Sequence, residues 1–96
     1  MDTEVTEDKL ARYFKITKKA LEILKIAPPE GTHLNKMALD FLDMAKRYFT
    51  DAGHFYEEGK WVQAFAALNY AHGWLDAGAR LGLFDVQHNS TLFTVD

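Results

Sequence analysis

The chain of 96 residues contains no cysteine and only two prolines. The absence of cysteine excludes disulfides, thiolate metal sites and cysteine nucleophiles, and it is typical of proteins in a reducing compartment. A membrane-spanning helix needs about 20 largely apolar residues, and no segment supplies them. The N-terminal residues MDTEVTEDK are acidic, whereas a signal peptide begins with basic residues. We therefore expect a cytoplasmic protein with no membrane partner.

Basic charge is also scarce, because the net charge at neutral pH is −3. The lysines of the first part of the chain are interleaved with Asp8 and Glu22, so they form no uniform face for phosphates. The sequence has no glycine-rich phosphate loop after a strand, and its only serine, Ser90, has no base at a fixed spacing. These absences predict that the protein is not an enzyme, holds no cofactor and does not bind nucleic acid.

Apolar residues recur at steps of three and four along most of the chain, which is the pattern of amphipathic helices. Thr6 precedes two acidic residues, as expected at a helix start, and Gly59 and Gly82 suit the left-handed residue that ends a helix. The segment APPEG interrupts the pattern once. The spacing predicts helices at residues 6–26, 32–58 and 61–81, and a tail at residues 83–96.

Connections as short as these force consecutive helices to run antiparallel. The sequence therefore predicts a single domain over residues 1–96. Its fold class is all-α, an antiparallel up-down-up three-helix bundle with a short irregular C-terminal tail. Within the tail, only the segment from Thr91 to Val95 has a pattern compatible with an extended chain.

The third segment, residues 61–82, is apolar around nearly its whole circumference. One stripe, which includes Leu68, Ala71 and Leu75, can face the first two helices. A further face also carries no charge, and its residues are Ala66, Tyr70, Gly73, Trp74 and Ala77. A helix that is apolar all round is normally buried. We therefore expect another segment or another molecule to pack on this second face.

A second copy of the chain, the folded-back tail or another protein could each cover this face. A monomer that exposes a plain alanine-rich face is a further alternative, because small apolar residues tolerate water. Ala66, Gly73 and Ala77 would let two helix backbones approach closely, and two-fold dimers are the commonest assemblies. We therefore expect a non-enzymatic helical interaction module that forms a homodimer, joined through the third helix and the tail.

Polar residues interrupt the apolar surface of the third segment at Asn69, His72, Asp76 and Arg80. They define an alternative function, the binding of a small ligand or nucleotide. His72 and Asp76 lie one turn apart, as do His54 and Glu58, and two ligands of one metal ion can have this spacing. Folding the hairpin at Gly59 separates the two histidines by about 12 Å, too far for a shared ion. The sequence therefore predicts no metal site.

The run AKRYFTDAGHFYEEGKWVQAFAALNYAHGWLDAGARLGLFDV, residues 45–86, contains the motifs YFTDA, EEGKWVQAF and NYAHGWLDAGARLGLF. Together they resemble the signature of an uncharacterised archaeal family, domain-of-unknown-function family three-five-seven, and the likeness extends more loosely over residues 10–86. The resemblance implies a small three-helix up-and-down bundle of archaeal, cytoplasmic origin. It implies no activity and no functional residues.

The segment HFYEEGKWVQAFAALNYA also resembles one helical hairpin of a tetratricopeptide repeat. Such repeats stack in arrays and need about three copies to be stable, whereas the pattern occurs here once. We interpret this second likeness as convergent hairpin packing that is compatible with a protein-binding surface.

Overall fold

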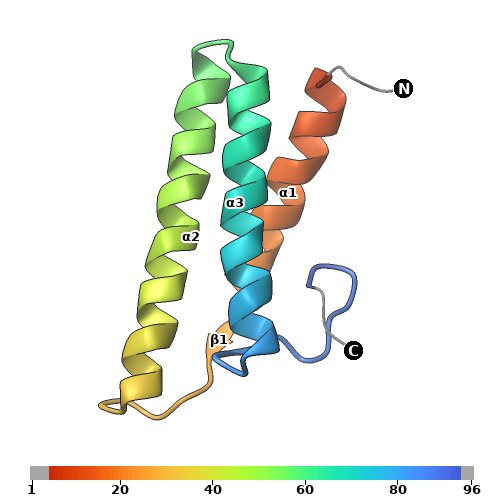
Figure 1. Cartoon of the computed structure of the whole chain (residues 1–96). Coiled ribbons are helices and arrows are strands. Elements are labelled where there is room, and N and C mark those ends of the chain that lie inside the picture. Colours follow the sequence, from red (N-terminus) through yellow and green to blue (C-terminus); the bar gives the residue numbers. More distant parts are fainter. Residues whose placement is uncertain (1–4, 94–96) are drawn as a thin grey trace.

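The computed structural model describes residues 5–93 of the chain. Within that range, three helices are α1 (Glu7–Ile23), α2 (His33–Glu57) and α3 (Trp61–Arg80). Each runs antiparallel to the helix before it, so the bundle is up-down-up (Figure 1). The predicted all-α three-helix fold is confirmed, and the two later helices lie within one residue of their predicted bounds.

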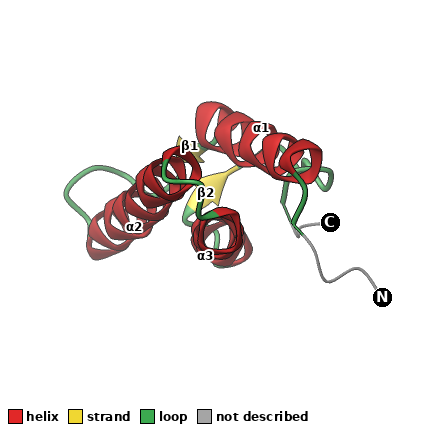
Figure 2. Cartoon of the chain, turned by 90° about the horizontal axis from the view of Figure 1, so that it is seen from above, coloured by secondary structure: helices red, strands yellow, loops and turns green. Residues whose placement is uncertain are grey.

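The helix α3 lies over the space between α1 and α2 and packs along both of them (Figure 2). Helices α1 and α2 also meet through aromatic side chains. Phe14 of α1 makes edge-to-face contacts with Phe49 and Tyr56 of α2, each at a ring-centroid distance of 5.8 Å. As a result, α3 has α1 on one side and α2 on the other, and a third side of α3 faces away from both helices.

The ends of the helices follow capping chemistry. The hydroxyls of Thr6 and Thr32 each accept a hydrogen bond from the backbone N–H three residues later, at 3.1 Å. Gly59 and Gly82 have φ angles of 75° and 77°, the left-handed conformation that glycine adopts without strain. The predicted positions of the turn between α2 and α3 and of the end of α3 are therefore confirmed.

The prediction that the first helix reaches residue 26 is wrong, because α1 ends at Ile23. Leu24 has an extended backbone, and the next two residues form the strand β1 (Lys25–Ile26). This strand pairs antiparallel with β2 (Phe84–Asp85) in the tail. Pairing with β2 gives the backbone of β1 hydrogen-bond partners outside the helix, so the helical pattern stops one turn early.

The extended part of the tail also lies elsewhere than predicted. Within the predicted segment at residues 91–95, residues 91 and 92 belong to a turn that begins at residue 90, residue 93 forms a bend, and residues 94 and 95 lie outside the described part. The side-chain oxygen of Asn89 closes this turn by accepting hydrogen bonds from the N–H groups of Thr91 and Leu92, at 3.1 and 3.0 Å. The strand forms at Phe84 instead because β1 offers it a backbone partner there.

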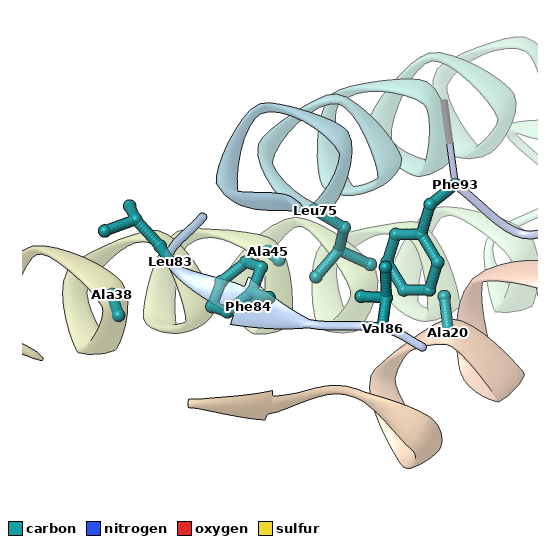
Figure 3. Packing of buried hydrophobic residues seen from close by; sticks show 8 residues of the cluster. All are labelled: Ala20, Ala38, Ala45, Leu75, Leu83, Phe84, Val86 and Phe93. Carbon is teal, nitrogen blue, oxygen red and sulfur yellow. The ribbon is translucent and has the colours of Figure 1, made fainter. Parts of the chain in front are cut away.

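The tail folds back and completes the core at one end of the bundle. Figure 3 shows Leu75 of α3 pointing toward Val86 and Phe93 of the tail. The Phe84 ring lies so close to Gly78 of α3 that a Cβ atom there would clash with it. A second buried cluster, around Leu10 and Leu68, fills the other end. The tail therefore covers the inner side of α3, and the site of interest lies on the other side.

Candidate docking surface on the third helix

The inner face of α3 is buried against the other elements and carries small residues where helices come close. Its buried residues are Ala64, Ala67, Leu68, Ala71, Leu75 and Gly78. Alanines at 0% exposure face it from α2, at positions 38, 45 and 52. Short side chains on both helices allow close backbone approach and dense packing. This face is the stripe that the sequence assigned to the core.

The opposite face of α3 carries a row of apolar residues that we call the outer stripe. Its members are Val62, Ala66, Tyr70, Gly73, Ala77 and Leu81. The three largest side chains, those of Val62, Tyr70 and Leu81, are 66%, 62% and 67% exposed. Isolated exposed apolar residues are common on proteins, but a row along one helix face marks a candidate interaction site.

A shallow, open groove of about 550 Å³ lies on this face. Its lining residues are Ala66, Asn69, Tyr70, Gly73, Trp74 and Ala77. All five residues of the interaction surface expected from the sequence are therefore brought together, and Asn69 joins them. Trp74 is half-buried, and its ring packs edge-on against Phe41 of α2 at a centroid distance of 5.0 Å.

Aromatic packing also fixes the border of the outer stripe. The ring of Tyr70 stacks on that of Tyr48 of α2, with 5.2 Å between centroids and 18° between planes. On the other side, Tyr13 and Ile16 of α1 are each 37% exposed and lie beside Gly73 around a neighbouring groove. These three border residues were not predicted. Tyr48 lies seven positions after Phe41 on α2, which puts both on one side of that helix, but this spacing does not show that Tyr48 contacts Tyr70 of α3.

No contact within the described residues requires a glycine at position 73. A Cβ atom added there would meet no atom within 4 Å, and the residue is helical with no positive φ. A glycine inside a helix is about 1 kcal/mol less favourable than alanine. Gly78 differs, because the Phe84 ring occupies the space that its side chain would need. Packing within residues 5–93 therefore explains Gly78 and leaves Gly73 unexplained.

The polar residues of α3 are only partly brought together. Asn69, His72 and Asp76 line a groove of about 230 Å³ between α1 and α3, and Arg80 does not line it. His72 Nε2 lies 2.5 Å from the backbone carbonyl oxygen of Leu92. This geometry assigns the ring proton to Nε2, which donates to that carbonyl.

The other ring nitrogen, Nδ1 of His72, lies 3.4 Å from the hydroxyl oxygen of Thr17 and accepts its proton in this tautomer. A carboxylate oxygen of Asp76 lies 3.7 Å from Nε2. His72 thus joins α1, α3 and the tail. Thr17 and Leu92 were not predicted as its partners, because they lie 55 and 20 residues away along the chain.

Other titratable groups do not gather into a site. Among residues 5–93, no group of three or more histidine, aspartate or glutamate side chains is arranged to hold a metal ion. Glu58, one turn from His54, forms an ion pair with Lys60 at 3.1 Å.

The pKa of Tyr56 is raised, chiefly because its hydroxyl donates a 2.7 Å hydrogen bond to the Glu7 carboxylate. This pair joins α2 to the start of α1, outside the outer stripe.

Comparisons with known proteins agree with the resemblance found in the sequence. A family model with the description "Protein of unknown function (DUF357)" matches residues 12–84, more than half of the chain. The matched range includes all of α2, α3 and the outer stripe. Neither the comparison with curated proteins nor that with solved structures gave a match. None of the described helices has the length and apolar character that a bilayer crossing requires.

Proposed function

This chain belongs to the family described as "Protein of unknown function (DUF357)", and from that premise we propose that it is a non-enzymatic helical interaction module that self-associates through the outer stripe of α3. The observation that carries the proposal is the exposure of Tyr70 and its apolar neighbours along one charge-free row. The docked tail supports it further, because the tail packs on the inner side of α3 and leaves this row uncovered by residues 83–93.

The expected affinity follows from the size of the exposed side chains. Burying one large apolar side chain contributes roughly 1.5–3 kcal/mol, and two copies would bring together two sets of Val62, Tyr70 and Leu81. Association itself costs about 4–15 kcal/mol in lost translational and rotational freedom. Because the two quantities are similar, we expect a dimer that dissociates on dilution.

Light scattering over a dilution series tests the proposal. We expect the mass of a dimer at high concentration and that of a monomer at low concentration. Gly73→Leu should shift dissociation to higher concentration, because a bulky side chain would separate the two α3 helices. Gly53→Leu is the matched control, since Gly53 is also a helical glycine with open space around its Cβ position but lies on α2. A monomer at every concentration would refute the proposal.

We also propose a cytoplasmic location and an archaeal origin. The absence of cysteine supports the location, and the resemblance of residues 45–86 to an archaeal family supports the origin. Fractionation of cells that express the tagged chain tests the location. Recovery of the chain in the membrane or secreted fraction would contradict it.

A second candidate function is ligand binding in the groove between α1 and α3. It is supported by the position of Asn69, His72 and Asp76 around one opening. Both ring nitrogens of His72 already have partners, and Asp76 lies 3.7 Å from one of them, so a ligand would rely chiefly on Asn69 unless the tail moved. Melting curves with Mg²⁺, Zn²⁺ and a nucleoside triphosphate test this function, because a ligand that binds the folded state raises the melting temperature. A shift that Asn69→Ala abolishes would support it, and no shift with any of the three would refute it.

A further inference from the structure

The outer stripe has a symmetric spacing that specifies how a second copy would fit. Its six residues follow one another at steps of four, four, three, four and four positions. The same series is read in either direction, and its centre lies between Ala71 and His72. Two copies of α3 that run antiparallel about this centre would therefore place equivalent levels of the two stripes opposite each other, with the helices crossing at an angle because rows of residues four apart are inclined to the helix axis.

In that register the residues that meet are complementary in size. Val62 faces Leu81 of the second copy, Ala66 faces Ala77, and Tyr70 faces Gly73. The exposed Tyr70 ring thus meets the position where no side chain stands and where a Cβ atom would have open space. The two alanines meet on both sides of that contact, so the helix backbones can approach closely. Gly73, which packing within residues 5–93 leaves unexplained, is required in this arrangement.

A parallel pairing of the same stripes is less favourable. It would place Tyr70 against Tyr70 and Gly73 against Gly73, so that large residues meet large ones and gaps meet gaps. It would also bring Arg80 of each copy to the same level, whereas the antiparallel register places Arg80 at the level of Gln63. Like charges across an interface oppose association, and an amide oxygen can accept a hydrogen bond from arginine. Antiparallel helix dipoles attract each other as well.

The size of the face suits a weak dimer. From Val62 to Leu81 the stripe is about 30 Å long, and a helix with its side chains is about 10–12 Å wide. α3 alone would therefore contribute on the order of 300 Å², less than the roughly 800 Å² that each partner buries in a standard interface, and the bordering side chains of α1 and α2 add to it. Tyr13 and Ile16 add exposed apolar surface at its border.

We propose that two copies of this chain pair through antiparallel α3 helices about a two-fold axis between Ala71 and His72, with Tyr70 of each copy seated at Gly73 of the other. This inference rests on the proposed self-association and specifies its geometry. A second copy is favoured over a partner of a different sequence because the row is complementary to itself in size, with Tyr70 opposite Gly73 and Ala66 opposite Ala77.

Disulfide trapping tests the register, and the chain has no native cysteine to interfere. The double variant Ala66→Cys/Ala77→Cys should form covalent dimers on oxidation. Each single variant alone should stay monomeric on a non-reducing gel, and a mixture of the two should form covalent dimers. The reason is distance: the two copies of residue 66 would lie about 16 Å apart along the axis, whereas a disulfide needs Cα atoms within about 7 Å. The same separation prevents a bridge between positions 66 and 77 inside one chain.

The pair Val62→Cys and Leu81→Cys should behave in the same way. The mismatched pair Ala66→Cys and Leu81→Cys is one turn out of register and should form no covalent dimer. The dimer mass of each variant is measured first under reducing conditions. A dimer whose Ala66→Cys variant links to itself, or whose matched pairs fail to link, overturns the antiparallel register and leaves the proposed function intact. A native chain that is monomeric at every concentration overturns both.

Discussion

The inner and outer faces of α3 are built from the same kinds of residue but differ in what covers them. On the inner face, Leu68 and Leu75 are at most 1% exposed, whereas on the outer face Tyr70 and Leu81 are more than 60% exposed. Each face contains a glycine, and only Gly78 on the inner face has a neighbour that requires it. The comparison teaches that apolar composition alone does not reveal a core, because a helix can be as apolar toward solvent as toward its own bundle.

Replacing one leucine on each face by alanine gives the largest expected contrast. Leu75→Ala should lower the free energy of unfolding by about 2–5 kcal/mol, because it removes buried methyl groups and leaves a cavity. Leu81→Ala should change it by less than about 0.5 kcal/mol, because the side chain is mostly in water. Urea unfolding followed by circular dichroism measures both values at a concentration where light scattering finds only monomer. Equal losses would show that the outer face is packed within the monomer.

Adding a methyl group to each glycine is a second way to separate the faces. Gly78→Ala should cost about 1–3 kcal/mol, because the Phe84 ring must move away from the new Cβ atom. Gly73→Ala should stabilise the dilute monomer by up to about 1 kcal/mol, since alanine is the better helix former and its Cβ meets nothing. The same unfolding experiment gives both values. A loss of monomer stability in Gly73→Ala would contradict the open space that the structure assigns to that position.

His72 lies at the boundary between the two faces, and its ring is hydrogen-bonded to Thr17 of α1. Thr17→Val keeps the shape of this buried side chain but removes the hydroxyl that donates to His72 Nδ1. We expect a loss of about 1 kcal/mol in the free energy of unfolding, because one hydrogen bond to a half-buried ring is removed. Thr50→Val on the exposed surface of α2 is the control and should be nearly neutral. Equal effects would mean that the bond to His72 adds no stability.

The smallest effect concerns a contact that joins α1 to α2 without α3. The hydrogen bond from Tyr56 to the Glu7 carboxylate, followed by the negative charge of Glu7, raises the pKa of Tyr56 above 10.0. The stabilisation is therefore complete below pH 10.0 and is lost as the pH rises through the higher pKa of the folded state.

Glu7→Gln should lower the pKa of Tyr56 toward 10.0, because it removes the charge while an amide oxygen remains as acceptor. Ultraviolet titration of the native chain and of the variant measures the difference. Identical curves would contradict the contact. Asp8→Gln, which changes the neighbouring carboxylate of the same helical turn, is the matched control and should leave the Tyr56 titration unchanged.

Much of the fold could be predicted because amphipathic helices have apolar residues at regular steps of three and four positions. The rhythm of apolar residues located α2 and α3 closely, and the hydroxyl of Thr6 marked the start of α1. The end of α1 was not predictable, because a two-residue strand has no period and β1 depends on β2, about 60 positions further along the chain. The partners of His72 were missed for the same reason, since Thr17 and Leu92 become its neighbours only when the chain folds.

The sequence alone determined that α3 would be apolar on two sides and that Gly73 would stand within a row of small and aromatic residues. Both follow from residue identity and the helical period, which are local properties. The sequence also indicated which stripe would face the bundle, but the tertiary structure alone decided what covers each side, because that depends on where α1, α2 and the tail come to lie against α3. It also distinguished the two glycines, since whether a missing side chain is needed depends on which atoms stand opposite it in space.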